Sequence, residues 1–300
     1  MTAVIALEKL TKSYGSHRGI IDVDLEVQQG EVFGFLGPNG AGKTTTIRTM
    51  LDLIRPTSGT ARVFGIESSA DPVAIHRRIG YLPGEFALYD RLTGAQTLEY
   101  FANLRGGVDQ VYQESLIDRF ELDASRRFRE YSKGNKQKVG LIVALQHKPD
   151  LLMLDEPTAG LDPLMQQSFF EMVKETAGEG RTAFISSHIL SEVEKTCGRV
   201  AIIREGRIVK IDEVDALRDL AHHQVELRFA GDPPAADFVN LPGVSDVVVD
   251  DHLIRLRVLG SITPVVQAAA QAGVVDFLSR EPSLEETFLA QYGRESVEVK

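Results

Sequence analysis

The sequence predicts a large α/β domain followed by a small α+β domain, and three patterns support this prediction. An apolar segment at residues 31–36 leads directly into a glycine-rich loop, after which apolar residues recur at helical spacing. A second apolar run, Leu151–Leu154, has the composition of a strand buried on both faces in a parallel sheet. Beyond residue 215 the pattern changes to short strands and helices in the order β-α-β-β-α-β, which is the ferredoxin-like order.

The first elements of the larger domain follow from local patterns. Residues 4–8 and 20–27 are predicted strands, and apolar and polar residues alternate in the second, so one of its faces is solvated. Thr93 and Gln96 have the spacing of a capping box, which begins a helical region extending to about His147. The helix after the glycine-rich loop is marked by Ile47, Met50, Leu51 and Ile54.

The later elements show equally local signals. The dipeptide Asp162-Pro163 has the pattern of a helix N-cap with proline at the first helical position. A buried strand is predicted at residues 183–185, and the turn Glu205-Gly206 between two apolar runs predicts a hairpin. In the C-terminal segment the predicted elements are strands at 224–229, 244–249, 253–258 and 274–278, helices at 235–240 and 263–272, and a last amphipathic helix at Leu284–Tyr292.

Length and composition limit the class of protein. A chain of 300 residues suggests one large and one small domain. We place the large domain at 1–218 and the small domain at 222–300. Within the large domain we expect a helical subdomain at about 86–148. The net charge is −10, whereas nucleic-acid-binding domains are typically basic, so the charge disfavours a nucleic-acid binder. The single cysteine, Cys197, excludes an internal disulfide and fits a reducing compartment. We expect no secretory signal, because acidic Glu8 comes too early in the first segment. The uncharged stretch 258–275 is too polar to span a bilayer, so we expect any membrane function to require a partner that supplies the span.

The glycine-rich loop fits the phosphate-binding pattern G-x-x-x-x-G-K-[ST]. Its glycines allow consecutive backbone N–H groups to face phosphate oxygens, and the following helix directs its positive end at the same anion. Lys43 is expected to bridge the β- and γ-phosphates of a nucleotide, and the Thr44 hydroxyl to bind Mg²⁺. The alternative, a glycine-rich turn that merely precedes a helix, is disfavoured because pattern, strand and helix agree. The expected ATP-binding residues are Gly37, Pro38, Asn39, Gly40, Ala41, Gly42, Lys43, Thr44 and Thr45.

Two adjacent carboxylates, Asp155 and Glu156, follow the second apolar run. The carboxyl end of a parallel strand is where ligands bind in α/β sheets. We expect Asp155 to hold Mg²⁺, through water, and Glu156 to orient or deprotonate the attacking water. An acid pair capping a loop is the alternative, and the apolar run before it and Pro157 after it favour the catalytic interpretation.

Further motifs have the order and spacing of the ATP-binding cassette (ABC) superfamily, which this sequence resembles over about residues 4–215. The run Tyr131–Lys138 is similar to the LSGGQ signature. Ala159–Asp162 resembles the D-loop, and His188 lies at the position of the switch histidine. Tyr14 falls where the family has the aromatic residue that stacks on adenine. The resemblance implies a P-loop NTPase fold with a RecA-like core, an antiparallel β subdomain and a helical subdomain.

The resemblance also assigns roles to these residues. The signature residues are expected to complete the γ-phosphate site of an opposite protomer, from the N-terminus of a helix that Ser132 opens and that extends to about Gln146. His188 is expected to contact the γ-phosphate and to link it to Glu156 and to Asp162 of the partner's D-loop. A capped helix and a structural histidine are the alternatives for these residues taken singly. The signature residues concerned are Ser132, Lys133, Gly134 and Asn135.

A second and more diffuse resemblance concerns the tail from Glu281, which is similar to exporter ATPases of the daunorubicin-resistance type in the ABC-2 group. Together the resemblances imply an ATPase subunit that uses ATP and Mg²⁺ and powers a separate integral membrane permease. They imply a second nucleotide-binding subunit, with a homodimer favoured, and a peripheral location on the cytoplasmic face of the membrane. Residues 222–300 are expected to serve regulation or dimer contact, because they contain no clustered acid, base or metal ligand.

The sequence departs from the family at two places. Gly84 lies where the family has a glutamine that contacts Mg²⁺ and the membrane partner. Either the next residue, Glu85, or a water molecule could serve instead, and Glu85 could also be a solvated loop acid. In the signature, Lys133 and Asn135 replace glycine and glutamine, whereas Ser132 and Gly134 are kept. We therefore expect nucleotide binding and phosphate sensing to be kept, and the two changes leave the turnover rate and the coupling to transport open.

Two other functions would each explain part of the sequence. An ABC ATPase acting on DNA or the ribosome would need a long coiled coil or two cassettes, and the sequence shows neither. The acidic net charge also disfavours binding to nucleic acid. Another P-loop enzyme, such as a nucleotide kinase, would explain Lys43 and Asp155 but not the signature, D-loop and switch positions together. A metal site at His222-His223 is disfavoured because no cysteine or carboxylate cluster lies nearby in the sequence.

Overall fold

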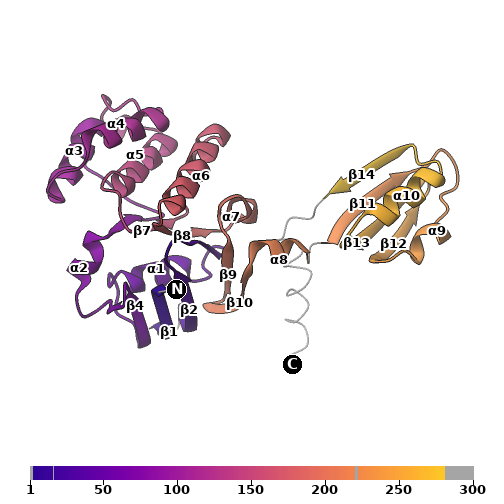
Figure 1. Ribbon diagram of the computed structural model, residues 1–300, viewed down its shortest axis with the longest axis horizontal. Coiled ribbons are helices and arrows are strands. Elements are labelled where there is room, and N and C mark those ends of the chain that lie inside the picture. Colours follow the sequence, from indigo (N-terminus) through magenta and orange to yellow (C-terminus); the bar gives the residue numbers. More distant parts are fainter. Residues whose placement is uncertain (1–2, 16, 220–221, 281–300) are drawn as a thin grey trace. The chain divides into compact units, whose positions relative to one another are not determined.

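The computed structural model describes residues 3–15, 17–219 and 222–280 (Figure 1). Contacts divide the chain into two compact units, residues 1–212 and 213–300. Helix α8 (Val214–Asp219), which the sequence analysis placed in the first domain, is therefore grouped with the second unit. The predicted helix Leu284–Tyr292 and the tail from Glu281 lie outside the described residues.

A six-stranded sheet forms the centre of the first unit, with the strand order β10-β9-β3-β8-β7-β6. The pairs from β9 through β3, β8 and β7 to β6 are all parallel. The buried strands β3 and β7 are almost wholly apolar, and β8 is apolar at residues 183–185, as expected for a sheet covered on both faces. The strands are β3 (Val32–Leu36), β6 (Ile79–Leu82), β7 (Leu151–Asp155), β8 (Thr182–Ser187), β9 (Arg199–Arg204) and β10 (Arg207–Glu213).

A second, antiparallel sheet of the same unit has the order β2-β1-β4-β5. The sequence analysis identified β1 and β2 but not β4 and β5, because β4 begins with polar residues and a glycine. That glycine, Gly59, has φ +76, and a Cβ on it would lie 2.2 Å from the carbonyl oxygen of Lys9, so the close approach of β1 requires glycine. The strands are β1 (Ala3–Tyr14), β2 (His17–Gln28), β4 (Ser58–Val63) and β5 (Ile66–Glu67).

One hydrophobic core joins the two sheets through the helix that follows the glycine-rich loop. Leu10 and Ile20 of the antiparallel sheet, Ile47 and Met50 of α1, and Phe35 of β3 all belong to it and are fully buried. Helix α1 covers residues 43–50, so Ile54 of the predicted helical pattern lies beyond its end. The other helices of this unit are α2 (Pro72–Arg77), α3 (Gly94–Leu104), α4 (Gln110–Arg119), the 3₁₀ turn η1 (Phe128–Glu130), α5 (Lys133–Leu145), α6 (Pro163–Gly178) and α7 (Leu190–Thr196).

The predicted helical region contains α3, α4 and α5, which lie together at one end of the unit (Figure 1). The capping box at its start is confirmed, since Thr93 and Gln96 exchange both side-chain to backbone hydrogen bonds. Helix α5 lies directly against β6, because a Cβ on Gly80 would fall 2.0 Å from the carbonyl oxygen of Ala144. This contact fixes the helical group on the parallel sheet.

Arg105, at the end of α3, makes a second connection between the helical group and the sheet. Its guanidinium donates hydrogen bonds to the carbonyl oxygens of His76, Arg77 and Ile79 at 2.9 to 3.2 Å. His147, just after α5, contacts the carbonyl oxygen of Ile79 at 3.1 Å. Burial lowers the pKa of Arg105, and burial together with the charge of Arg105 lowers the pKa of His147 to about 4.

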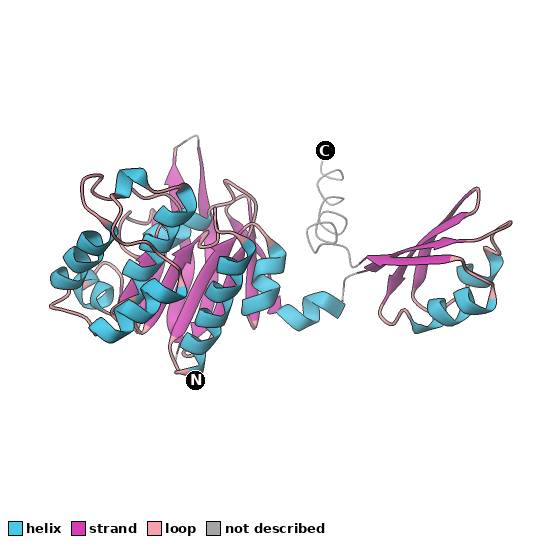
Figure 2. Cartoon of the chain, turned by 90° about the horizontal axis from the view of Figure 1, so that it is seen from above, coloured by secondary structure: helices cyan, strands magenta, loops and turns pink. Residues whose placement is uncertain are grey.

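The second unit contains a four-stranded antiparallel sheet of order β12-β13-β11-β14, with two helices on one face (Figure 2). Its own core includes Leu227, Phe238, Ile254 and Val265. The elements follow in the β-α-β-β-α-β order: β11 (His222–Arg228), α9 (Ala236–Val239), β12 (Val244–Asp250), β13 (Leu253–Leu259), α10 (Thr263–Gln271) and β14 (Asp276–Arg280). Among the residues described in either unit, no helix has the length and apolar character needed to cross a bilayer.

Replacing His147 is expected to weaken the pH dependence of stability in mild acid. The pKa of its ring is about 4 in the folded protein, against 6.5 ordinarily, so between these values the unfolded chain binds more protons. The free energy of unfolding therefore falls as the pH falls from 6.5 through 4, by at most about 1.4 kcal/mol per pH unit for this one group. Urea denaturation at about pH 7.5 and about pH 5.5 should show a smaller loss for His147→Gln than for the wild type. Equal losses of stability in the variant and the wild type would contradict the burial of a neutral His147 ring.

Candidate nucleotide-binding site

The glycine-rich loop connects β3 to α1 at the carboxyl edge of the parallel sheet. The N–H of Gly37 donates to the carbonyl oxygen of Ser187 at 3.1 Å, which anchors the loop to the end of β8. Gly42 has φ +113, and a Cβ on it would lie 2.7 Å from Ile20, so this position requires glycine. No side chain caps α1, whose first N–H groups therefore remain suited to an anion. Pro38, Asn39 and Gly40 are exposed, whereas Ala41, Lys43 and Thr46 are buried.

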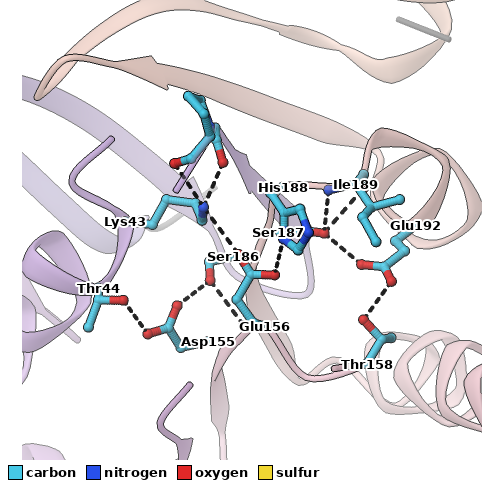
Figure 3. A network of polar contacts seen from close by, with 12 residues as sticks. Lys43, Thr44, Asp155, Glu156, Thr158, Ser186, Ser187, His188, Ile189 and Glu192 are labelled. Atoms are coloured by element: carbon cyan, nitrogen blue, oxygen red, sulfur yellow. Dashed lines mark hydrogen bonds and ion pairs between the residues drawn. The ribbon is translucent and has the colours of Figure 1, made fainter. Parts of the chain in front are cut away.

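Lys43 lies inside the curve of this loop (Figure 3). Its residue surface is only 6% exposed, and its Nζ donates to the carbonyl oxygens of Gly37 and Pro38 at 2.6 and 3.3 Å. The same ammonium is 3.1 Å from Oε1 of Glu156. The loop thus holds a cation at its centre, next to the carboxylate that the sequence analysis proposed as the catalytic base.

Thr44 and Asp155, predicted as metal ligands from separate motifs, meet in the structure. The hydroxyl of Thr44 donates to Oδ2 of Asp155 at 2.6 Å, and the hydroxyl of Ser186 donates to the other oxygen, Oδ1 (Figure 3). Asp155 is fully buried. A hydroxyl and a carboxylate are the oxygen donors that Mg²⁺ prefers, so these residues fit that ion.

Glu156 and His188 form the second half of the site. Nδ1 of His188 lies 2.7 Å from Oε2 of Glu156, while Oε1 of Glu156 faces Lys43 (Figure 3). The backbone of Glu156 is in the left-handed region with φ 52, and its N–H donates to the carbonyl and hydroxyl oxygens of Ser186. The carboxylate is therefore held between a lysine and a histidine that come from different segments of the chain.

The signature segment begins α5, as predicted. Ser132 caps this helix by accepting a hydrogen bond from the N–H of Asn135 at 3.2 Å, and Ser132 and Lys133 are exposed. A Cβ on Gly134 would lie 2.5 Å from the carbonyl oxygen of Gly160, so the start of α5 touches the D-loop of its own chain. Asp162 caps α6 by accepting hydrogen bonds from two backbone N–H groups, which confirms the predicted N-cap.

Several predicted residues are not joined to the loop by any hydrogen bond or ion pair in the part of the chain that the structure describes. Tyr14 is 43% exposed at the tip of the β1–β2 hairpin, where Nζ of Lys12 lies 5.3 Å from its ring centroid. Glu85 is exposed, whereas Gly84 lies against the site: a Cβ on it would be 3.3 Å from Oδ2 of Asp155.

Sequence analysis missed four side chains that support the site. Ser186 and Ser187 end the apolar strand β8, and two polar residues at the carboxyl end of a buried strand were the available signal. Gln137 of α5 is 4% exposed and donates to the carbonyl oxygens of Glu156 and Pro157. Glu192 of α7 gave no sequence signal, since a glutamate on a short helix is ordinary. No group of three or more His, Cys, Asp or Glu residues that could hold a metal occurs among the described residues.

Comparisons with known proteins agree on one family. The family model described as ABC transporter matches residues 20–159. A bacitracin transport ATP-binding protein of Enterococcus faecalis is 35% identical over 260 residues, which cover 85% of this chain and 84% of that protein. A daunorubicin resistance ATP-binding protein of Streptomyces coeruleorubidus is 34% identical over 299 residues, which cover 95% of this chain and 94% of that protein.

Solved structures show the same fold for the first unit. An ATP-binding subunit of an ABC transporter superposes with a TM-score of 0.66 at 31% identity, covering 72% of this chain and 92% of that one. A dimeric bacterial ABC transporter cassette gives a TM-score of 0.64 at 22% identity, and the match covers 70% of this chain and 98% of that one. With the glycine-rich loop, Asp155, Glu156 and His188 gathered at one edge of the sheet, this chain belongs to the ATP-binding subunits of ABC transporters, a family of ATPases.

Proposed function

We propose that this chain binds ATP with Mg²⁺ and hydrolyses it to power export through a separate membrane-spanning subunit. The observation that carries the proposal is that Lys43, Asp155, Glu156 and His188 come together at the carboxyl edge of the parallel sheet. Thr44 joins Asp155 there through a 2.6 Å hydrogen bond. A phosphate chain, a metal ion and an attacking water need these groups within one site.

The residues divide the chemistry between them. The loop N–H groups, the N-terminus of α1 and Lys43 bind the phosphates and balance their negative charge. Thr44 and Asp155 hold Mg²⁺, which when bound supplies further charge neutralisation at the phosphate oxygens. Glu156 orients a water molecule and accepts its proton on a carboxylate oxygen, so that the hydroxide oxygen bonds to the γ-phosphorus as the bond to the β-phosphate oxygen breaks.

His188 holds Glu156 in this role. Its Nδ1 contacts the Glu156 carboxylate at 2.7 Å, and the ring is nearly half exposed. No described residue is hydrogen-bonded to its other nitrogen, which can therefore meet a phosphate oxygen. Gly84 leaves the space beside Asp155 without a side chain, and in our proposal a water molecule there takes the position of the family's glutamine amide. Glu85 is the other candidate for this position.

The exposed signature segment supports a composite site. Ser132 and Lys133 lie at the positive end of α5 but are not joined to the phosphate loop of their own chain by any described hydrogen bond or ion pair. In our proposal the segment from Ser132 to Asn135 meets the nucleotide held by a second subunit, with Asp162 at the same contact. Because one chain carries both halves of the site, a homodimer has two equivalent sites.

The relatives indicate the kind of transport. The proteins from Enterococcus and Streptomyces are named for bacitracin transport and daunorubicin resistance, and the match extends over most of both chains. We therefore propose a permease partner of the ABC-2 exporter type, drug-like cargo, and a peripheral position on the cytoplasmic face of the membrane. The alternative of an ABC ATPase acting on nucleic acid or the ribosome finds no support in these relatives.

For the second unit we propose a ferredoxin-like accessory domain, residues 222–300, that regulates the ATPase or contributes to dimer contact. Its strand order β12-β13-β11-β14 and its separate core around Leu227 and Ile254 support an independently packed domain. Among its described residues, no group of three or more His, Cys, Asp or Glu could hold a metal ion.

Glu156→Gln should bind ATP with near wild-type affinity but release phosphate at least ~10²-fold more slowly, because a neutral amide cannot accept the proton of water. Phosphate release at saturating ATP, together with equilibrium binding of a fluorescent ATP analogue, measures both quantities. Glu171→Gln, an exposed acid on α6, is the matched control. Near-normal turnover in Glu156→Gln would remove Glu156 from the proposed role.

Mixing two inactive variants tests the composite site. Lys43→Ala disables the phosphate loop and Ser132→Glu disables the signature, so each homodimer should be inactive. A mixed dimer contains one site in which both halves are intact, so an equimolar mixture should recover about a quarter of wild-type turnover. Recovery only at the level of the separate variants would exclude sites shared between two copies of this chain.

Removing residues 222–300 should leave ATP affinity within about twofold of the full chain, because no residue of the proposed site lies in that unit. Binding of the same fluorescent analogue measures affinity, and circular dichroism checks that the shortened chain is folded. A folded but non-binding fragment would show that the second unit contributes to the site.

A further inference from the structure

Glu192, in the first turn of α7, is a buried carboxylate for which the proposed mechanism has no use. The residue is 8% exposed, and no ion pair joins it to any residue that the structure describes. Two hydroxyl groups satisfy it instead: Thr158 donates to Oε1 and Ser187 donates to Oε2, both at 2.6 Å (Figure 3). A buried charge without a cation is costly, so this carboxylate depends on its two hydroxyl donors and in turn restrains the segments that carry them.

The two donors flank the catalytic pair along the chain. Thr158 lies two residues after Glu156, and Ser187 directly precedes His188. Because His188 contacts Glu156 at 2.7 Å, the contacts close a ring from Glu156 through Thr158, Glu192, Ser187 and His188 back to Glu156 (Figure 3). Glu192 is the member of the ring that ties the segment after β7 to the segment after β8.

Ser187 also connects this ring to the phosphate loop. Its carbonyl oxygen accepts a hydrogen bond from the N–H of Gly37, and its hydroxyl oxygen accepts one from the N–H of Ile189 at 2.9 Å. A displacement of Ser187 would therefore move the turn that carries His188. Glu192 restrains that residue with the strongest kind of bond available to a hydroxyl, one donated to a charged oxygen.

We propose that Glu192 is a positioning residue that holds Glu156 and His188 in register for ATP hydrolysis. This inference rests on the proposed function of that pair. Glu156 has a left-handed backbone conformation, so its carboxylate direction depends on the segments around it. Misplacement of a catalytic group by about 1 Å can cost ~10²-fold in rate, whereas binding of phosphate by the loop tolerates it better.

The chemistry of the ring requires a carboxylate. Each hydroxyl has one hydrogen to donate, and only a carboxylate accepts on both of its oxygens. In Glu192→Gln, the amide NH₂ must donate to one of the two hydroxyls, so the Thr158 or the Ser187 bond is reversed and loses its charged acceptor although the shape is kept. The effect should appear in the catalytic step, since no atom of Glu192 contacts the loop at 37–45 through a hydrogen bond in the described chain.

The test compares Glu192→Gln with the wild type as full-length protein, using ATP hydrolysis at varied ATP concentration. We expect kcat to fall at least ~10-fold while KM for ATP changes less than about twofold. Glu171→Gln, which removes an exposed acid of α6, should match the wild type in both constants. Unchanged kcat in Glu192→Gln, or a loss confined to KM, would overturn the inference.

A double-mutant cycle separates positioning from general destabilisation. If Glu192 acts through His188, the double variant Glu192→Gln/His188→Ala should be about as slow as His188→Ala alone. Multiplying effects in the double variant would show that Glu192 acts independently of His188 and would overturn that part of the proposal, whereas action on Glu156 is tested through Thr158.

If Glu192→Gln does not fold, Thr158→Val tests the role of Glu192 instead, because it removes a single hydroxyl donor at nearly constant shape. It should reproduce the fall in kcat with little change in KM. Glu156→Gln in the same assay separates the role of Glu192 from the proposed function of the pair Glu156 and His188. Normal turnover in Glu156→Gln would remove the proposed function of the pair, whereas a slow Glu156→Gln beside a normal Thr158→Val would remove only the role of Glu192.

Discussion

The position of β8 between β3 and β7 is the constraint on which the site depends. In this parallel register Leu36 of β3 lies opposite Ser187, and Asp155 of β7 lies opposite Ser186. The phosphate loop, the paired carboxylates and the switch histidine each begin where one of these strands ends. A shift of one strand by one residue would turn its side chains to the other face of the sheet and separate these groups. Burial of all three strands makes such a shift costly, so the sheet fixes the site.

The two consecutive serines of β8 show how a strand can serve both sides of a sheet. Successive side chains of a strand point to opposite faces. Ser186 donates to Asp155 beside Thr44, and Ser187 donates to Glu192 beside Thr158. Each of these buried carboxylates is thus satisfied by two hydroxyl groups, and neither forms an ion pair with a described residue. Hydroxyls stabilise such charges while leaving a carboxylate oxygen able to accept further partners, which is the property a metal ligand requires.

The helical group reaches the same site by a different route. Gln137 of α5 donates to the carbonyl oxygens of Glu156 and Pro157, and Gly134 lets the start of α5 touch the D-loop at Gly160. The signature helix is therefore attached directly to the segment that carries the proposed base. A displacement of the helical group would therefore act on Glu156 through this contact.

The sequence by itself determined the buried strands, the phosphate loop, the caps at Thr93, Asp162 and the signature helix, and the identity of Asp155 and Glu156 as strand-end acids. These features depend on local composition and on spacing, which a linear sequence carries in full. The strands β4 and β5 were not predicted because they have no clear apolar pattern of their own. Contact with the adjacent strand β1, as at Gly59, determines their structure. Only the tertiary structure decided that Lys43 faces Glu156, that Ser186 and Gln137 support the site, and that Glu192 closes a ring around it. Those contacts join residues 5 to 113 positions apart, and their existence depends on strand order and register, which no local pattern specifies.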